Sequence, residues 1–204
     1  LSEKTEYNTV IQSVATNTGD RSAATNTGEW SAATNTGDQS AATNTGDYSA
    51  ATNMGYQSAA INTGYCSSAL NTGNYSVAVN TGIRSVTLNT GDCSAATNIL
   101  SWSAASVEGK KSVAVVTGRN SYVKGALGCA IFAVERDIEY NITSVCAAIV
   151  DGEKIKADTW YMVKNGQFVE YEETKKKIKH RYGKKIWKFW KIFQYLRKYL
   201  KQII

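Results

Sequence analysis

The sequence predicts an all-β fold, a β-solenoid built from a nine-residue repeat. The repeat is Ser-Ala-Ala-Thr-Asn-Thr-Gly-Asp-x, and its serine returns every nine residues from Ser13 to Ser121 without insertion or deletion. A fixed period of this kind indicates one structural unit stacked on itself. The 204 residues include no proline, so strand pairing is not interrupted by that residue. We number the repeat positions 1 to 9, starting at the serine.

Two repeats are expected to form one coil of the solenoid. Positions 1 to 6 suit a short strand, and positions 7 to 9 suit a turn. Nine residues cannot enclose a core, whereas an 18-residue coil with two strands and two turns can do so. The glycine at position 7 marks a corner that needs either a positive φ or a close backbone approach. Residues 13–121 then give about six coils, and residues 1–12 are expected to form an N-terminal cap.

Alternation along a strand places positions 2, 4 and 6 on one face and positions 1, 3 and 5 on the other. Position 4 changes from threonine to Ile61, Leu70 and Val79, and position 2 becomes Val77. We therefore expect positions 2 and 4 to face inward and position 5 to form an outer ladder. The reverse remains open, because stacked asparagines also stabilise solenoid interiors. The ladder residues are Asn17, Asn26, Asn35, Asn44, Asn53, Asn62, Asn71, Asn80, Asn89 and Asn98.

Two ligand-binding hypotheses for the repeat are less favoured than a structural one. The Thr-Asn-Thr triplets are similar to ice-binding arrays, but the array is interrupted at Met54, Ile61 and Leu70. An inward threonine column also argues against ice binding. Calcium-binding nonapeptides need regular carboxylates, yet position 8 changes from Asp20 to Tyr56. We therefore expect no metal ion and no cofactor.

Residues 122–174 are expected to form a small β-rich module that caps the solenoid. The apolar runs 126–134 and 142–150 have the length of strands. Asn165-Gly166 suits a type I′ turn between strands in 158–164 and 167–172. A solenoid must cover its open end to avoid association through its edges, which favours a capping role for this module.

Three segments carry a resemblance to known proteins. They are SVAVVTG at 112–118, KGALGC at 124–129 and VDGEKIKADTWY at 150–161. Together with the repeats, they resemble a family of uncharacterised proteins of phages, prophages and gut bacteria, over residues 13–172. The resemblance implies a phage or bacterial origin but no activity. The Ser-Val-Ala-Val units also resemble, more weakly, the β-rolls in the heads of trimeric adhesins.

Residues 175–204 form a strongly basic tail with the pattern of an amphipathic helix. The tail holds twelve Lys or Arg and no acidic residue, whereas the rest of the chain has a net charge of −6. Apolar residues return at alternating spacings of three and four, as in a heptad seam. The seam consists of Ile186, Phe189, Phe193, Leu196, Leu200 and Ile203.

The tail has three candidate partners. It can pack on the solenoid or on its copies in an oligomer, lie on a membrane surface, or bind nucleic acid. Packing within a homo-oligomer or larger protein assembly is favoured, a membrane surface comes second, and nucleic acid is least favoured. Frequent cations exclude a transmembrane span. The candidate contact residues are Trp187, Trp190, Lys184, Lys188 and Lys191.

The sequence gives no indication of catalysis. His180 is the single histidine and lies in the basic tail, and the chain has no Ser-His-Asp set and no phosphate-binding loop. No two of the cysteines form a CxxC pair, and we expect free thiols. The main hypothesis is a non-catalytic structural or adhesive solenoid. The alternative is a membrane-surface or host-factor binding protein acting through the tail. Localisation stays open between the bacterial cytoplasm and a virion or cell surface. The cysteines are Cys66, Cys93, Cys129 and Cys146.

Overall fold

The computed structural model describes residues 5–171 and shows an all-β solenoid, as the repeat predicts. Leu1–Val169 form one compact unit, and a second unit starts at Glu170 and lies almost wholly outside the described residues. The strands form two nine-stranded sheets. Consecutive strands alternate between the two sheets from β1 to β15, and the two halves of each coil therefore belong to different sheets.

The first sheet contains the odd-numbered strands from β1 to β15 and ends in β16. In spatial order it consists of β1 (Thr5–Asn8), β3 (Ala23–Asn26), β5 (Ala41–Asn44), β7 (Ala59–Asn62), β9 (Val77–Asn80), β11 (Ala95–Asn98), β13 (Val113–Val116), β15 (Ala130–Arg136) and β16 (Ile142–Ile149).

The second sheet contains the even-numbered strands from β2 to β14 and ends in the C-terminal hairpin of β17 and β18. In spatial order it consists of β2 (Val14–Asn17), β4 (Ala32–Asn35), β6 (Ala50–Asn53), β8 (Ser68–Asn71), β10 (Val86–Asn89), β12 (Ala104–Val107), β14 (Tyr122–Gly125), β17 (Tyr161–Lys164) and β18 (Gln167–Glu170).

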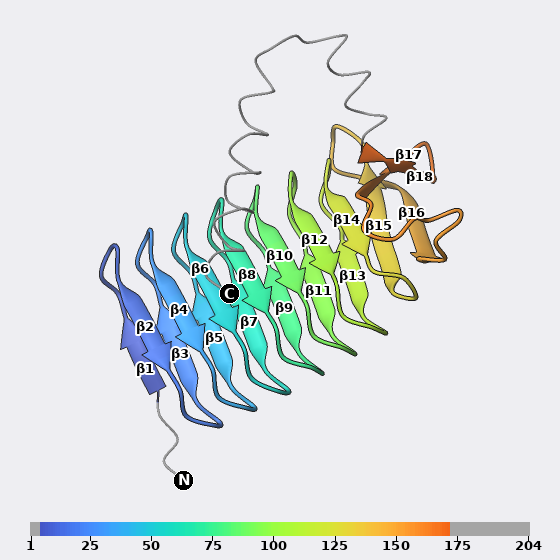
Figure 1. The fold of residues 1–204 in the computed structure, drawn as a ribbon. Coiled ribbons are helices and arrows are strands. Elements are labelled where there is room, and N and C mark those ends of the chain that lie inside the picture. The colour runs from blue at the N-terminus through green and yellow to red at the C-terminus, as the bar shows by residue number, and fades with distance from the viewer. Residues whose placement is uncertain (1–4, 172–204) are drawn as a thin grey trace. The chain divides into compact units, whose positions relative to one another are not determined.

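Strands of successive coils pair in parallel with an offset of 18 residues as far as β14, as in Ala59 with Val77 and Ala50 with Ser68, and β13 pairs with β15 at an offset of 17. The prediction of two repeats per coil is therefore confirmed, and Figure 1 shows the coils stacked from β1 to β15. The stack has about seven turns, one more than expected. The difference arises because β1 lies in the segment expected as a cap, while β14 and β15 extend the parallel stack beyond residue 121.

The predicted orientation of the repeat is wrong. In β7, Ala60 and Asn62 are fully buried, whereas Ala59 and Ile61 are half-buried on the outside. Position 1 is also buried, as at Ser58. Positions 1, 3 and 5 therefore face inward, and positions 2 and 4 face outward. The interior accepts asparagine because its amide group satisfies backbone groups at the corners, so polarity does not exclude it from the core.

Two positions of the repeat shape the corners: position 9 through its backbone conformation, and position 7 through the small size of glycine. Position 9 has a left-handed backbone in thirteen successive units, with φ between 52° and 61°, although no residue there is glycine. This conformation lets its N–H donate to the next coil, as Tyr48 N–H does to Tyr65 O at 2.8 Å. The gain offsets a cost of about 1 kcal/mol for a side chain in this region. The glycine of position 7 has no such φ, and the repeat needs it for space instead.

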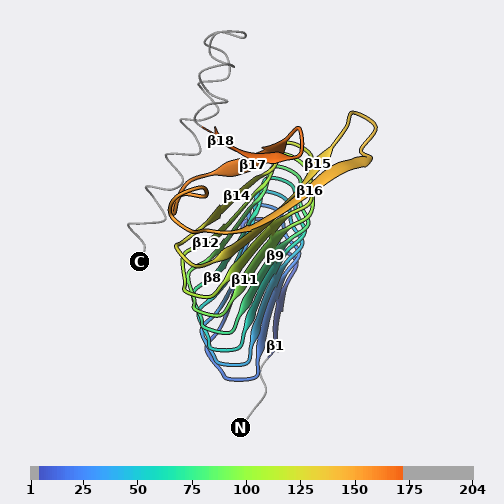
Figure 2. The same cartoon turned by 90° about the vertical axis from the view of Figure 1, so that its right-hand side faces the viewer.

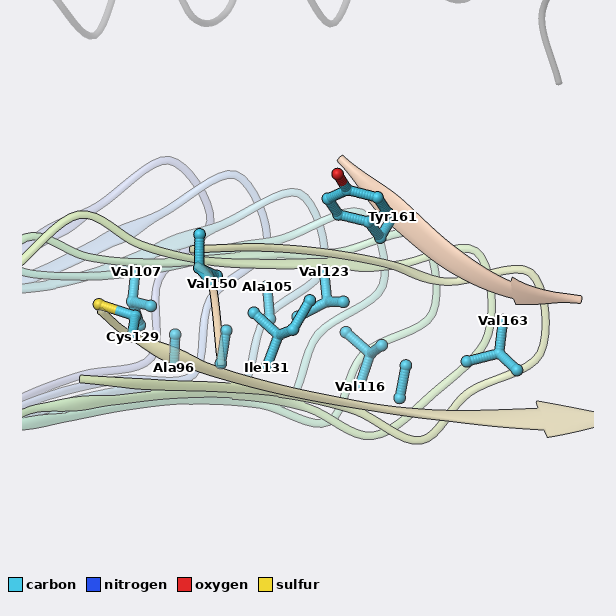
Figure 3. Close-up of a cluster of buried hydrophobic side chains, with 12 residues drawn as sticks. Ala96, Ala105, Val107, Val116, Val123, Cys129, Ile131, Val150, Tyr161 and Val163 are labelled. Atoms are coloured by element: carbon cyan, nitrogen blue, oxygen red, sulfur yellow. The ribbon is translucent and has the colours of Figure 1, made fainter. Parts of the chain in front are cut away.

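Larger side chains replace Ala and Asn in the last coils and build an apolar core. Val107 and Val116 occupy the asparagine position, and Val123 occupies the alanine position. These residues pack with Ile131 and with Tyr161 from β17, as Figure 3 shows. This core joins the end of the solenoid to the strands that follow it.

Two hairpins end the described chain, and their strands overlap the predicted runs, although β15 begins at Ala130 and β17 at Tyr161, later than expected. β16 pairs antiparallel with β15, and β17 pairs antiparallel with β14. Asn165 and Gly166 both have positive φ, as a type I′ turn requires. Figure 2 shows the turn end of the β15–β16 hairpin extending beyond the coils. The parallel stacking therefore ends in antiparallel pairing.

Candidate functional site

The predicted asparagine ladder lies inside the solenoid as two columns, one in each sheet. Asn62 represents the central coils: its Nδ2 donates to Ser49 O at 3.1 Å and to Ser68 O at 3.2 Å. Its Oδ1 accepts from Gly64 N–H at 2.9 Å. An amide group bonded in this way ties together three backbone positions at a corner. The first column holds Asn26, Asn44, Asn62, Asn80 and Asn98, and the second holds Asn17, Asn35, Asn53, Asn71 and Asn89.

The serines of position 1 form a second ladder that sequence reasoning missed. Ser49 N–H donates to Ser67 Oγ at 3.0 Å, and Ser67 Oγ contacts the carbonyl oxygens of Gly46 at 3.2 Å and Tyr65 at 3.1 Å. The same pattern returns at an 18-residue offset along both edges. Each serine therefore links the coils on either side of it. The near-constancy of serine across the repeats was the available signal.

The glycines of position 7 are required by close approach between coils. A Cβ atom built on Gly64 would lie 1.9 Å from Gly46 O, which is far inside van der Waals contact. In the unit where Leu100 stands at this position, Asn98 Oδ1 is buried without a hydrogen-bond partner. Glycine thus permits both the stacking of the corners and the closing hydrogen bond of the asparagine.

The carboxylates of position 8 also connect neighbouring coils. Asp38 Oδ1 accepts from Tyr56 N–H at 2.8 Å, and Asp47 Oδ1 accepts from Tyr65 N–H at 2.8 Å. Asp20 Oδ1 accepts in the same way from Asp38 N–H at 3.0 Å. Within residues 5–171, no three His, Cys, Asp or Glu side chains gather as a metal ion would need. The recurring acids serve the stacking of corners.

The outward faces of the two sheets carry small and apolar uncharged side chains. On the first sheet, positions 2 and 4 from β3 to β13 hold only Ala, Val, Thr and Ile. On the second sheet, the same positions from β4 to β10 hold Ala, Ser, Thr, Val and Leu. The threonines of position 4 face outward and not inward as expected. Their direction therefore does not argue against ice binding. Ile61 and Leu70, which interrupt the array of threonines, lie on these outward faces as well.

Aromatic side chains gather along the edge where the chain passes from the first sheet to the second. Trp30 stacks on Tyr48 with ring centroids 4.4 Å apart and planes 6° apart. Tyr48 meets Tyr65 edge-on at 5.8 Å, and Arg84 Nη1 donates to Tyr65 Oη at 2.6 Å. These residues occupy neighbouring coils, so the contacts add a side-chain ladder to the corners. Contacts between neighbouring coils account for this group without a ligand.

The chain itself covers the outward face at the C-terminal end of the second sheet. Lys124 of β14 is buried, and its Nζ lies 3.4 Å from Glu108 Oε1 and 3.8 Å from Asp158 Oδ1. The same Nζ lies 5.6 Å from the centre of the Trp160 ring. Asp158 N–H also donates to Gly125 O at 3.0 Å. This network fixes the segment before β17 across the last coils.

Glu135 joins the two C-terminal hairpins. Its Oε1 accepts from Asn165 N–H at 2.9 Å, and its Oε2 accepts from Gly166 N–H at 3.0 Å and Ser144 Oγ at 2.8 Å. Partial burial by itself raises the pKa of Glu135. The hydrogen bonds from Gly166, Ser144 and Asn165 outweigh this effect, and the pKa of Glu135 lies below its usual value. The ionised carboxylate is therefore the form that holds the hairpins together.

Glu135→Gln is expected to lower stability at neutral pH by about 1 kcal/mol, because charge-assisted hydrogen bonds to a partly exposed group are lost. The carboxylate stabilises the fold above its ordinary pKa of about 4.3, and this contribution disappears as pH falls through the lower folded-state value. Thermal unfolding from pH 7 to pH 3 should show the two proteins converging in acid. Glu139→Gln, at an exposed carboxylate of the same hairpin, is the control. A difference that persists in acid would contradict the role of ionisation.

The predicted residues of the basic tail lie outside the described residues. This applies to the apolar seam from Ile186 to Ile203, to Trp187 and Trp190, and to the neighbouring lysines. In the part of the chain that the structure describes, no helix has the length and hydropathy needed to cross a membrane. The four cysteines are free, with Cys66 and Cys93 on opposite edges of the coils.

Comparisons with protein-family models, with curated proteins and with solved structures found no match.

Proposed function

We propose that the protein is a non-catalytic structural platform, a rigid β-solenoid that takes part in a larger assembly. The resemblance of its repeats and C-terminal module to phage and gut-bacterial proteins suggests a virion or a bacterial cell surface as the place of that assembly. The proposal concerns the solenoid itself and does not depend on the basic tail.

The polar residues of the solenoid support a structural role. Asn62, Ser67 and Asp47 all direct their side chains to backbone groups of their own or neighbouring coils. Groups used in this way stiffen the stack, because each coil is joined to the next by side-chain bonds as well as by strand pairing. A stiff stack of constant register is suited to holding other surfaces at fixed spacing.

The observation that carries the proposal is the uncharged outward face of the first sheet. From β3 to β13 its outward positions include Val77 and Val113 but no Asp, Glu, Lys or Arg. Soluble monomers usually intersperse charges over such a surface, and extended uncharged areas mark interfaces. The face thus favours a chain that works in contact with other protein surfaces.

Light scattering after size-exclusion chromatography tests this proposal. The full chain has a mass of 22.2 kDa, and we expect a species of at least twice that mass at concentrations of about 10–100 µM, a range suited to interfaces of moderate size. A mass that stays at 22.2 kDa across this range would contradict the proposed assembly.

A further inference from the structure

The two sheets have four edge strands, and one of them is longer than the others and carries no charge. The edges are β1 and β16 in the first sheet and β2 and β18 in the second. An edge strand presents unpaired backbone N–H and C=O groups to any other chain. Proteins usually protect such edges with short strands or with charges.

The N-terminal edges are protected by Glu6. This residue of β1 pairs with Ala24 and so occupies the inward position that is alanine in the next coils of this sheet. Its Oε2 accepts from Thr16 N–H of β2 at 3.1 Å. A carboxylate at an inward position opposes the addition of a further coil to the stack. It also accepts the hydrogen bond of a backbone N–H on β2, the second edge strand, so this N–H is not available to another chain. Both strands have four residues.

The edge strand β16 has no comparable protection. It has eight residues, Ile142–Ile149, and none of them is charged. Its outward side chains are strongly exposed, with Val145 at 54% and Ile149 at 66%. An irregularity in pairing lies near Ile142, at the turn end, and leaves the rest of the strand regular. By contrast, β18 has four residues and includes Glu170.

The inward side of β16 is occupied by the chain itself. Cys146 Sγ lies 3.1 Å from Gly166 O, and Ser144 bonds to Glu135. The outward side and the strand edge thus remain available for contact within the described part of the molecule. A long, regular, uncharged edge of this kind is a template for β-strand addition.

We propose that β16 pairs antiparallel with β16 of a second copy of this chain, so that two first sheets become one continuous sheet. This inference rests on the proposed function and names the surface and the partner of the assembly. A twofold axis near Val145 would place the Thr143 side chain of one copy opposite Ala147 of the other, on the same face. Such an interface is self-complementary, as closed dimers require.

The absence of charge along β16 favours a second copy as the partner. A strand that carries charge would meet the same charge in its own copy, whereas the sequence ITSVCAAI brings no repulsion. In addition, Val145 and Ile149 continue the uncharged outward face formed by Val113 and its neighbours. Pairing would therefore join two uncharged faces into one larger surface.

Sedimentation equilibrium of the full chain tests the pairing with Val145→Lys and a matched control, Val113→Lys. Both valines are exposed on the outward side of the first sheet, but Val113 lies in an interior strand. We expect a dimer for the unmodified chain and for Val113→Lys. For Val145→Lys we expect dimerisation at least about tenfold weaker, since two lysines would face each other across the axis. Circular dichroism should show that all three proteins are folded alike.

Hydrogen exchange of the unmodified protein supplies a second readout that needs no substitution. Amides of β16 should exchange more slowly at high protein concentration, while amides of β7 should not change. Dimerisation unaffected by Val145→Lys, or weakened only by Val113→Lys, would overturn pairing through β16 but leave the proposed assembly standing. A strict monomer for the unmodified chain would overturn both.

Discussion

Replacement of Gly64 by alanine should unfold or strongly destabilise the central coils, lowering the free energy of unfolding by about 4 kcal/mol or more. The added Cβ would lie 1.9 Å from Gly46 O and 2.5 Å from its carbonyl carbon. Both atoms belong to a corner that is held between coils by hydrogen bonds on either side, Thr63 N–H to Asn44 O and Tyr48 N–H to Tyr65 O, so neither can move without separating two coils. The soluble yield and urea-induced unfolding followed by circular dichroism would measure the loss.

Gly19→Ala is the matched control, because Gly19 occupies the same repeat position in the first coils. Among the described residues, the nearest atoms to the new Cβ would belong to side chains, Ser22 Oγ at 2.8 Å and Asn17 Oδ1 at 3.5 Å. A hydroxyl can rotate away, and we expect a loss below about 1 kcal/mol. Equal losses for the two variants would show that glycine is needed for its own backbone freedom, and not for the approach of coils.

The sequence predicts the solenoid but not the direction of its side chains. Period, strand position and the two-repeat coil follow from spacing alone, and the structure confirms them. Alternation identifies two sets of positions, but it does not say which set is inside. The change from Thr25 to Ile61 predicts an inward position, but in the structure it reflects the tolerance of an outer face to substitution.

A different signal identifies the interior. Positions 1 and 5 keep serine and asparagine through successive coils, and position 3 keeps a small residue such as Ala60. Such constancy is what a thin interior with fixed hydrogen-bond partners demands, because a change in size or polarity would affect the coils on both sides. The close contact at position 7 and the serine ladder depend on distances between coils, which the spacing of residues does not provide.

Replacement of Asn62 should be the most damaging change among the inward polar side chains. Asn62→Ala would remove the amide group that bonds to Ser49 O, Ser68 O and Gly64 N–H, while Ser49 O would still accept from Ser68 N–H at 3.0 Å. The unpaired Gly64 N–H costs about 1–3 kcal/mol and each lost bond to a carbonyl oxygen about 0.5–1.5 kcal/mol. We expect a total loss of about 3–5 kcal/mol, because the effects are not independent. Urea-induced unfolding would measure it.

Asn62→Asp separates loss of the hydrogen bonds from loss of volume. Aspartate has nearly the shape of asparagine and can still accept from Gly64 N–H, but it cannot donate to Ser49 O or Ser68 O when ionised. Its buried charge would face two carbonyl oxygens, so we expect a loss of stability at pH 7 at least as large as that of Asn62→Ala. Thr63→Ala, at the adjacent exposed position, should change the stability by less than about 0.5 kcal/mol. If aspartate were tolerated as well as this control, the two donated bonds would contribute little, and the constancy of asparagine would have to come from packing alone.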